Sequence, residues 1–177
     1  MLFVALSLAY PLAVHFGMRH HGIGALAVLL LGMALLRLAF TRNAQWLAVA
    51  IGATVLALLA WASGDARPLK LYPALVNAVL LLVFGASLLR PPTVVERIAR
   101  LTEPDLSPRG VAYTRRVTQV WCAFFLFNGV LALATALWAP DHVWTLYNGL
   151  VAYVLIGLLA AGEWLVRRRV MAADAHG

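Results

Sequence analysis

The chain has 177 residues, of which 63% are hydrophobic and only 12% are charged, and its mean hydropathy is +0.87. A soluble domain is usually a little under half apolar, so this composition excludes an ordinary soluble protein and indicates an integral membrane protein. Because a spanning helix needs about 20 apolar residues, the length holds roughly six spans and no sizeable soluble domain. The lone cysteine, Cys122, excludes an intramolecular disulfide and argues against a cysteine-based metal site.

Apolar runs punctuated by charge predict an all-α, polytopic helical bundle that forms a single membrane domain over residues 1–177. The predicted spans are residues 2–17, 22–40, 45–63, 70–89, 117–138 and 144–166. The first run lacks the basic leader of a secretory signal and contains Pro11, so we interpret it as a retained, kinked span. Short polar breaks join the spans, except for a longer connection at residues 90–116.

The longer connection, residues 90–116, predicts a short amphipathic helix on the cytoplasmic membrane surface. Thr93 followed three residues later by Glu96 has the spacing of a capping box. Apolar residues then recur at helical spacing opposite two arginines; they are Val94, Ile98 and Leu101, opposite Arg97 and Arg100. Ser107 and Pro108 suit the cap and first turn of the next helix, which is therefore predicted to begin before the membrane.

The distribution of lysine and arginine predicts the orientation, because cytoplasmic loops carry the excess of these residues. With six spans the two termini share a side, and of the 14 lysines and arginines only Arg19, Arg67 and Lys70 fall on the opposite side. We therefore expect a multi-pass protein of the bacterial inner membrane with both termini in the cytoplasm. The net charge of +7 then reflects topology and attraction to anionic headgroups. A nucleic-acid partner is not expected, since no folded basic domain remains to bind one.

Amide and carboxyl groups within the spans are costly in lipid, so they are the natural candidates for function. The candidate intramembrane polar contacts are Asn77, Asn128, Asn148 and Glu163. A hydrogen bond to a neighbouring helix is the leading interpretation of Asn128, and pairing with one another or with backbone is the leading interpretation of Asn77 and Asn148. A polar pocket shared by Asn77 and Asn148 is the alternative.

Glu163 is predicted to lie one turn from the cytoplasmic surface, with Arg167 four residues further along the same helix face, which favours an ion pair. A close pairing of the last two spans would offer Arg115 or Arg116 as an alternative partner, and a functional role for the carboxylate stays open.

Small residues let helix backbones approach closely, and they recur on both of the last two spans, which predicts a tight pair. They lie in the stripe Gly149, Tyr153, Gly157 and Ala161 on the sixth span, and at Gly129, Ala132 and Ala136 on the fifth.

The sequence contains no catalytic constellation, cofactor motif or metal-ligand spacing that matches a known chemistry. His15, His20 and His21 cluster near one end of the first hairpin, but no carboxylate or cysteine lies beside them. We therefore expect neither a cofactor nor a metal site. An integral-membrane enzyme would have to rely on Glu163 with Tyr113 or a histidine, and the histidines are predicted on the opposite side of the membrane.

Three segments within residues 70–170 resemble known families. They are PPTVVERIARLTEPDL, YTRRVTQVWCAFFLFNGVLALATALW and WTLYNGLVAYVLIGLLAAGEWLVRR. Together they are similar to a group of small, largely uncharacterised bacterial inner-membrane proteins that are often encoded among genes for fatty-acid-like or aryl-polyene synthesis. More distantly, they resemble the intracellular septation protein A family, which is associated with cell-envelope maintenance and division. The resemblance implies a fold and a context, and it transfers no catalytic residue to this chain.

The leading hypothesis is a noncatalytic scaffold or lipid-interacting component of cell-envelope or acyl-lipid biogenesis. Its partners would be membrane lipids with anionic headgroups, and an acyl carrier protein or pathway enzymes with acidic surfaces. The candidate contacts are Arg97, Arg100, Arg109, Arg115 and Arg116.

Two alternatives stay open. A transporter or flippase for a lipid or polyene-type product would line its path with the four intramembrane polar residues. The scarcity of mid-membrane charge and the lack of matched broken helices count against this hypothesis. A septation-related envelope protein is the other alternative, and a homo-oligomer is compatible with each hypothesis.

Overall fold

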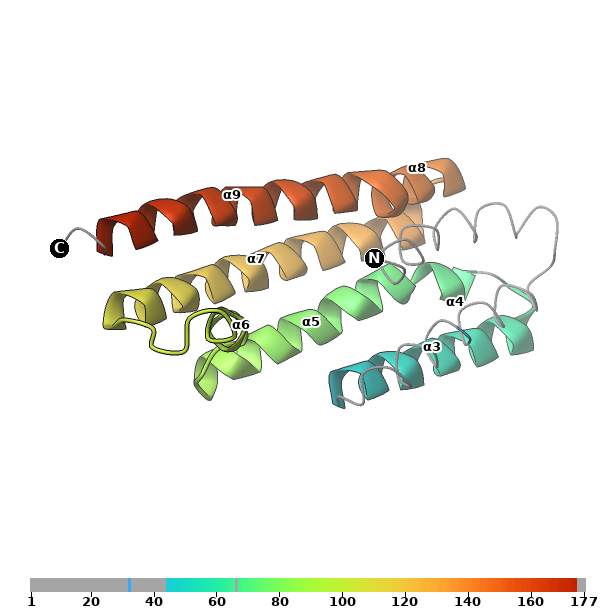
Figure 1. Ribbon diagram of the computed structural model, residues 1–177. Coiled ribbons are helices and arrows are strands. Elements are labelled where there is room, and N and C mark those ends of the chain that lie inside the picture. Colours follow the sequence, from blue (N-terminus) through green and yellow to red (C-terminus); the bar gives the residue numbers. More distant parts are fainter. Residues whose placement is uncertain (1–31, 33–43, 66, 175–177) are drawn as a thin grey trace.

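The structure, a computed structural model, describes residue 32, residues 44–65 and residues 67–174, and within this part every regular element is a helix (Figure 1). The elements are α3 (Ala44–Ser63), α4 (Arg67–Lys70), α5 (Tyr72–Leu89), α6 (Val94–Ala99), α7 (Pro108–Trp138), α8 (Asp141–Leu146), the π-helical turn η1 (Tyr147–Val151) and α9 (Ala152–Asp174). The spans predicted at residues 2–17 and 22–40, together with the histidine cluster between them, lie outside the described residues.

Three of the described helices are long and apolar enough to cross a membrane. They are Arg67–Leu89, Pro108–Trp138 and Asp141–Arg168, and they coincide with the last three predicted spans. The 20-residue helix α3 covers the span predicted at 45–63, and its Val49–Ser63 portion is apolar. The all-α class and the membrane-spanning helices are therefore confirmed for this part of the chain, whereas the total of six spans stays a prediction.

The helix ends around the long connection follow local rules that the sequence displays. The Thr93 hydroxyl accepts a hydrogen bond from the Glu96 amide at 3.2 Å, and the Glu96 carboxylate accepts one from the Thr93 amide at 3.4 Å. The predicted capping box is thus present at the start of α6. Ser107 caps α7 in the same way by accepting from the Gly110 amide at 3.1 Å, and Pro108 occupies the first turn.

Two of the candidate spans are bracketed by polar or aromatic residues at the spacing of a bilayer. Lys70 and Arg90 are 20 positions apart, as are Trp144 and Trp164, and at about 1.5 Å per residue each interval covers about 30 Å, the thickness of the hydrocarbon core. The 31 residues of α7 cover about 46 Å, so this helix is longer than the core. If the largely exposed Trp138 marks one boundary, the other falls near Thr118, and the first turns of α7 project beyond the membrane.

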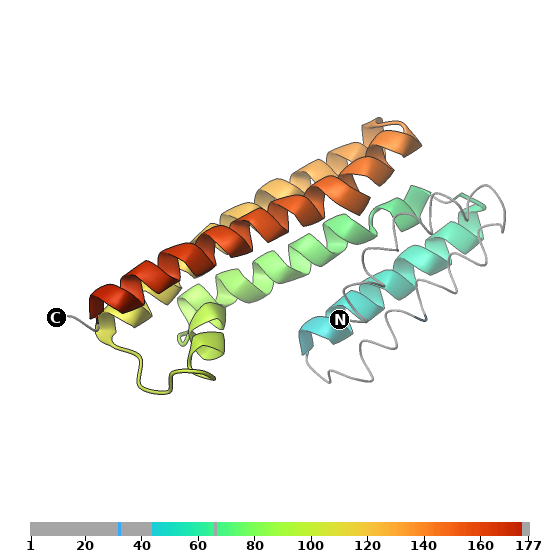
Figure 2. The ribbon, with the colours of Figure 1, turned by 45° about the horizontal axis from the view of Figure 1, so that its top comes forward.

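The closest helix pair is α5 with α7, and α3 packs against the other side of α5 (Figure 2). Small and apolar residues fill the core where these helices meet; they include Ala53, Ala57, Val79, Ala136 and Trp144. Gly129 on α7 is needed for the close approach, because a Cβ at this position would lie 3.1 Å from the Cβ of Asn77 on α5. Nearer the C-terminal end of α5, the rings of Phe84 and Phe125 meet edge to face with their centroids 5.1 Å apart.

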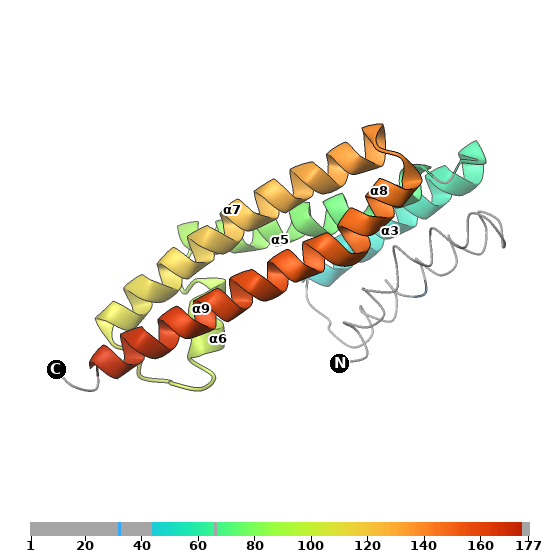
Figure 3. The same cartoon turned by 90° about the horizontal axis from the view of Figure 1, so that it is seen from above.

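The prediction of a tight pair between the last two spans is wrong. Helix α9 makes only a small contact with α7, and Figure 3 shows it running along the flank of the bundle. The C-terminal half of the predicted small-residue stripe faces away from the bundle. A Cβ at Gly157 would meet nothing within 4 Å, and Ala161 is exposed. The physical reason is that α5 already occupies the face of α7 on which Ala132 is buried and Gly129 allows close approach.

Candidate functional site

Apart from Arg67, the arginines of the described chain gather at one end of the bundle. Helix α6, the start of α7 and the end of α9 lie together at this end, and α4 and α8 lie at the opposite end (Figures 1 and 2). We call the first of these the basic end; its arginines are Arg90, Arg97, Arg100, Arg109, Arg115, Arg116, Arg167 and Arg168. The same end carries the carboxylates Glu96, Glu103, Asp105 and Glu163. The charge asymmetry read from the sequence is therefore also an asymmetry of the folded bundle.

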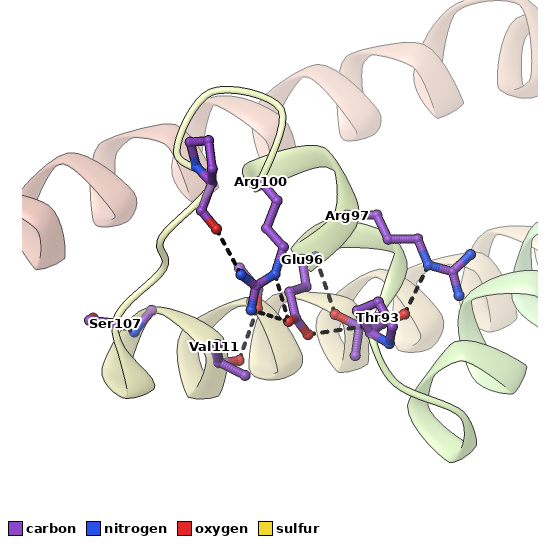
Figure 4. A network of polar contacts seen from close by, with 10 residues as sticks. Thr93, Glu96, Arg97, Arg100, Ser107 and Val111 are labelled. Atoms are coloured by element: carbon purple, nitrogen blue, oxygen red, sulfur yellow. Dashed lines mark hydrogen bonds and ion pairs between the residues drawn. The ribbon is translucent and has the colours of Figure 1, made fainter.

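A buried carboxylate organises the connection at the basic end (Figure 4). The Glu96 side chain is only 8% exposed, and its Oε1 atom accepts from Arg100 Nε at 3.0 Å and from Arg100 Nη2 at 2.8 Å. The remaining Arg100 nitrogen, Nη1, donates to the carbonyl of Pro104 at 2.8 Å. Because all three guanidinium nitrogens are bound within the chain, Arg100 holds the connection in place. Its side chain is still 39% exposed, so its contact with headgroups or partners stays a prediction.

The side of α6 that is buried in the bundle is not the predicted apolar side. Thr93, Glu96 and Ala99 are buried, whereas Ile98 is 56% exposed and Leu101 is 83% exposed. The capping box joins the two buried polar side chains, Thr93 and Glu96, and α6 packs against α7. Two of the three predicted apolar residues therefore point outward. Their contact with a membrane surface stays a prediction.

Both α5 and α9 fasten the connection. Ser87 Oγ on α5 accepts from the Val94 amide at 3.1 Å while donating to the Phe84 carbonyl at 2.7 Å. Arg167 Nη2 on α9 donates to the Thr102 hydroxyl at 3.5 Å. These contacts join the connection to two of the candidate spans, so residues 90–107 form a structured surface of the bundle.

Glu163 does not form the predicted ion pair. Among the ion pairs of the described residues none involves Glu163, and Arg167 reaches Thr102 instead. The Tyr113 hydroxyl donates to the main-chain carbonyl of Glu163 at 3.1 Å, which ties α7 to α9. The Glu163 carboxylate also interacts with this hydroxyl. The alternative partners, Arg115 and Arg116, project from α7 as exposed side chains and form no ion pair with a described residue.

The polar residues inside the bundle form hydrogen bonds with one another. Asn128 Nδ2 donates to Asn77 Oδ1 at 3.1 Å, and Asn128 Oδ1 accepts from the Tyr147 hydroxyl at 2.8 Å. Asn77 Nδ2 in turn donates to the Pro73 carbonyl at 2.8 Å. Both asparagines are buried, so this amide chain joins α5, α7 and η1 where lipid supplies no alternative partner.

Asn148 belongs to a separate contact. Its Nδ2 atom donates to the Thr135 hydroxyl at 3.2 Å and to the Trp144 carbonyl at 3.0 Å. The shared pocket of Asn77 and Asn148 is therefore not formed, because Asn77 binds Asn128 and Asn148 binds its own helix and α7. Asn148 and Tyr147 lie in the π-helical turn η1, and such turns often occur where a helix serves a function.

Sequence reasoning did not identify the junction at the opposite end. The buried Lys70 ammonium donates to the Asp141 carboxylate, and the Trp144 indole nitrogen donates to the Lys70 carbonyl at 3.1 Å. Trp144 is completely buried. The available signal was that one lysine and one aspartate occur in loops predicted on the same side, which hydropathy alone does not join.

Within the described residues, no group of three or more histidine, cysteine, aspartate or glutamate side chains is arranged to hold a metal ion. No protein-family model matches the chain, and no curated protein or solved structure matches it. The likeness to the acyl-lipid and septation families therefore stays an expectation drawn from the sequence.

Proposed function

We propose that the protein is a noncatalytic scaffold of the bacterial inner membrane that supports cell-envelope or acyl-lipid biogenesis. In this proposal the basic end faces the cytoplasm, where its arginines contact anionic headgroups and the acidic surfaces of partner proteins. The observation that carries the proposal is the construction of residues 90–107. The Glu96–Arg100 pair and the capping box hold this segment in one conformation, so the surface that carries Arg97 has a defined shape.

The length of α7 divides the arginines of the basic end by their depth. Arg115 and Arg116 lie within one turn of Thr118, at the expected level of the lipid phosphates. Arg109 lies about 10 Å further out on the same helix, beyond the headgroups. Arg97 is exposed on α6, where its Nε donates to the Pro92 carbonyl at 3.0 Å. The outer arginines are thus suited to a soluble partner and the inner ones to lipid.

An acidic protein of acyl-chain metabolism is the partner class that best fits this surface. An acyl carrier protein is small and acidic, and electrostatic complementarity mainly accelerates and orients such encounters. Glu103 and Asp105 lie on the same connection, so the arrangement of charge, and not only its sum, determines which acidic protein binds.

A transporter or flippase stays the second candidate because a π-helical turn lies beside a buried amide chain. Against it, the Asn77 and Asn128 oxygens already accept hydrogen bonds from within the chain. A substrate that used these amides would have to break them apart. Vesicles containing the protein that move labelled phospholipid faster than empty vesicles would favour this candidate over the scaffold.

The scaffold is tested with the protein in nanodiscs of neutral phosphatidylcholine, which removes competing anionic lipid. Acyl carrier protein is the probe, and its binding is measured at low and at physiological salt. We expect salt-sensitive binding that falls about tenfold in the Arg97→Gln/Arg109→Gln variant, since each charge near the surface contributes about 1 kcal/mol or less.

Arg67→Gln is the control, because it removes an exposed arginine from the opposite end, and it should leave binding unchanged. Equal binding by all three proteins, or none by the unaltered one, would contradict the proposed role of the basic end.

A further inference from the structure

One exposed side of α7, over residues 116–130, carries a charged residue first, then a polar residue, then apolar residues. Arg116, Gln119, Ala123, Phe127 and Val130 follow one another at intervals of three or four residues, so they share one side of the helix. All five are exposed in the described structure. The helices α5 and α9 contact other sides of α7, where Asn128 and Tyr113 make their hydrogen bonds.

This order matches the cross-section of one leaflet. When Trp138 lies at the far boundary, the near boundary passes close to Thr118, and Arg115 and Arg116 then lie at phosphate depth. Ala123, Phe127 and Val130 lie between about 7 and 18 Å below this boundary, at the depth of the acyl chains. Gln119 lies at the transition, where ester groups are found.

The two arginines have no carboxylate to neutralise them within the described structure. Glu96 is bound by Arg100, and the described ion pairs include neither Arg115 nor Arg116. Two adjacent guanidinium groups favour a phosphate ligand, because the planar fork of each can donate two parallel hydrogen bonds to its oxygens. A soluble acidic protein fits less well, since the apolar half of the face lies at hydrocarbon depth.

We propose that this face binds one anionic phospholipid of the inner leaflet, with the phosphate on Arg115, Arg116 and Gln119 and an acyl chain along Ala123, Phe127 and Val130. The inference rests on the orientation in the proposed function. It adds a defined lipid site that is separate from the protein-binding arginines. Such a site would tie the position of the scaffold to anionic lipid, the class of product that acyl-lipid biogenesis supplies.

The test is native mass spectrometry of the full chain in detergent, titrated with phosphatidylglycerol, cardiolipin or phosphatidylcholine. We expect one saturable site for the anionic lipids and weaker binding of phosphatidylcholine. In the Arg115→Gln/Arg116→Gln variant the affinity for phosphatidylglycerol should fall on the order of 30-fold, from about 1 kcal/mol for each arginine. Inorganic phosphate alone should not displace the lipid.

Two further variants separate a site from general charge attraction. Arg97→Gln/Arg109→Gln removes the same charge from the same end and should change lipid affinity less than threefold. Ala123→Trp keeps the charge and should weaken phosphatidylglycerol binding by placing an indole where the acyl chain runs. Melting temperatures equal to that of the unaltered protein will show that each variant folds.

Equal losses in the two arginine variants, or equal affinity for phosphatidylcholine and phosphatidylglycerol, would overturn the lipid site. Acyl carrier protein binding in neutral nanodiscs should survive in the Arg115→Gln/Arg116→Gln variant. If lipid binding behaves as expected while no variant affects acyl carrier protein, the scaffold proposal fails and the lipid site stands.

Discussion

Helix α7 has two long neighbours, α5 and α9, and it binds them in different ways. Against α5 it makes a continuous contact that uses Gly129 for close approach and the Asn77–Asn128 hydrogen bond for alignment. Against α9 and the turn η1 before it, α7 makes separate hydrogen bonds. The Tyr147 hydroxyl of η1 donates to Asn128, and the Tyr113 hydroxyl of α7 donates to the Glu163 carbonyl of α9.

The difference shows what fixes a helix in lipid. Apolar side chains gain little by leaving lipid for another helix, so association depends on close backbone approach and on hydrogen bonds. The α5–α7 pair has both features, whereas α9 and η1 are held to α7 mainly by these hydrogen bonds. We therefore expect α5–α7 to be the stable unit and α9 to be the helix that separates first.

The largest expected effect comes from paired glycine substitutions. Gly129→Leu should destabilise the protein by about 3 kcal/mol, because the new side chain must displace Asn77 on α5. Gly157→Leu should change stability by less than about 0.5 kcal/mol, since a Cβ there meets nothing within 4 Å. Unfolding in detergent with increasing sodium dodecyl sulfate measures both. Equal losses would mean that α9 packs as closely as α5.

The contact of α8 with Lys70, at the end of the bundle opposite the basic end, should give the next largest effect. Trp144→Phe removes the hydrogen bond to the Lys70 carbonyl and leaves a void in a fully buried site, so we expect a loss of about 2 kcal/mol. Trp138→Phe, at a largely exposed position, is the matched control and should be nearly neutral. Comparable losses of stability in the two variants would mean that Trp144 is not buried against Lys70.

The buried amide pair should show a measurable coupling. A double-mutant cycle with Asn77→Leu and Asn128→Leu should give an interaction energy of about 1 kcal/mol, within the range found for hydrogen bonds between membrane helices. The cycle of Asn77→Leu with Asn148→Leu is the control and should give about zero, because Asn148 binds Thr135 and its own helix. A larger interaction energy in the control cycle would mean that Asn77 and Asn148 do share a pocket.

The smallest effect is expected where α9 reaches the basic end. Arg167→Gln removes a long, exposed hydrogen bond to Thr102, so the stability should fall by less than about 0.5 kcal/mol. Glu163→Gln should be equally mild, because the main-chain carbonyl that accepts from Tyr113 is kept and the side chain forms no ion pair. A loss of recruitment without a loss of stability in Glu163→Gln would instead give the carboxylate a functional role.

Local signals in the sequence predicted much of the architecture. The starts of α6 and α7 were predictable from Thr93 with Glu96 and from Ser107 with Pro108, because the capping partners lie within four residues of each other. Hydropathy located the last three candidate spans, and the distribution of arginine separated the two ends. Each of these features depends on neighbours in the chain or on composition, which one sequence contains.

The pairing of helices was not predictable in the same way. A helix that is apolar on every side carries no stripe to show which face meets which neighbour, so the rotations of α7 and α9 had to come from the folded structure. The Lys70–Asp141 pair and the Arg167–Thr102 contact join residues more than 60 positions apart. The same uncertainty in rotation led to the mistaken partner for Glu163 and to the mistaken pairing of the last two spans.

The most direct test of the scaffold is the side of the membrane on which the basic end lies. In a Cys122→Ser background, Leu101→Cys and Arg67→Cys provide one exposed thiol at each end of the bundle. With a membrane-impermeant maleimide on spheroplasts, we expect labelling of the Arg67 position in intact cells and of the Leu101 position only after permeabilisation. Labelling of the Leu101 position in intact spheroplasts would place the basic end outside and contradict a cytoplasmic scaffold.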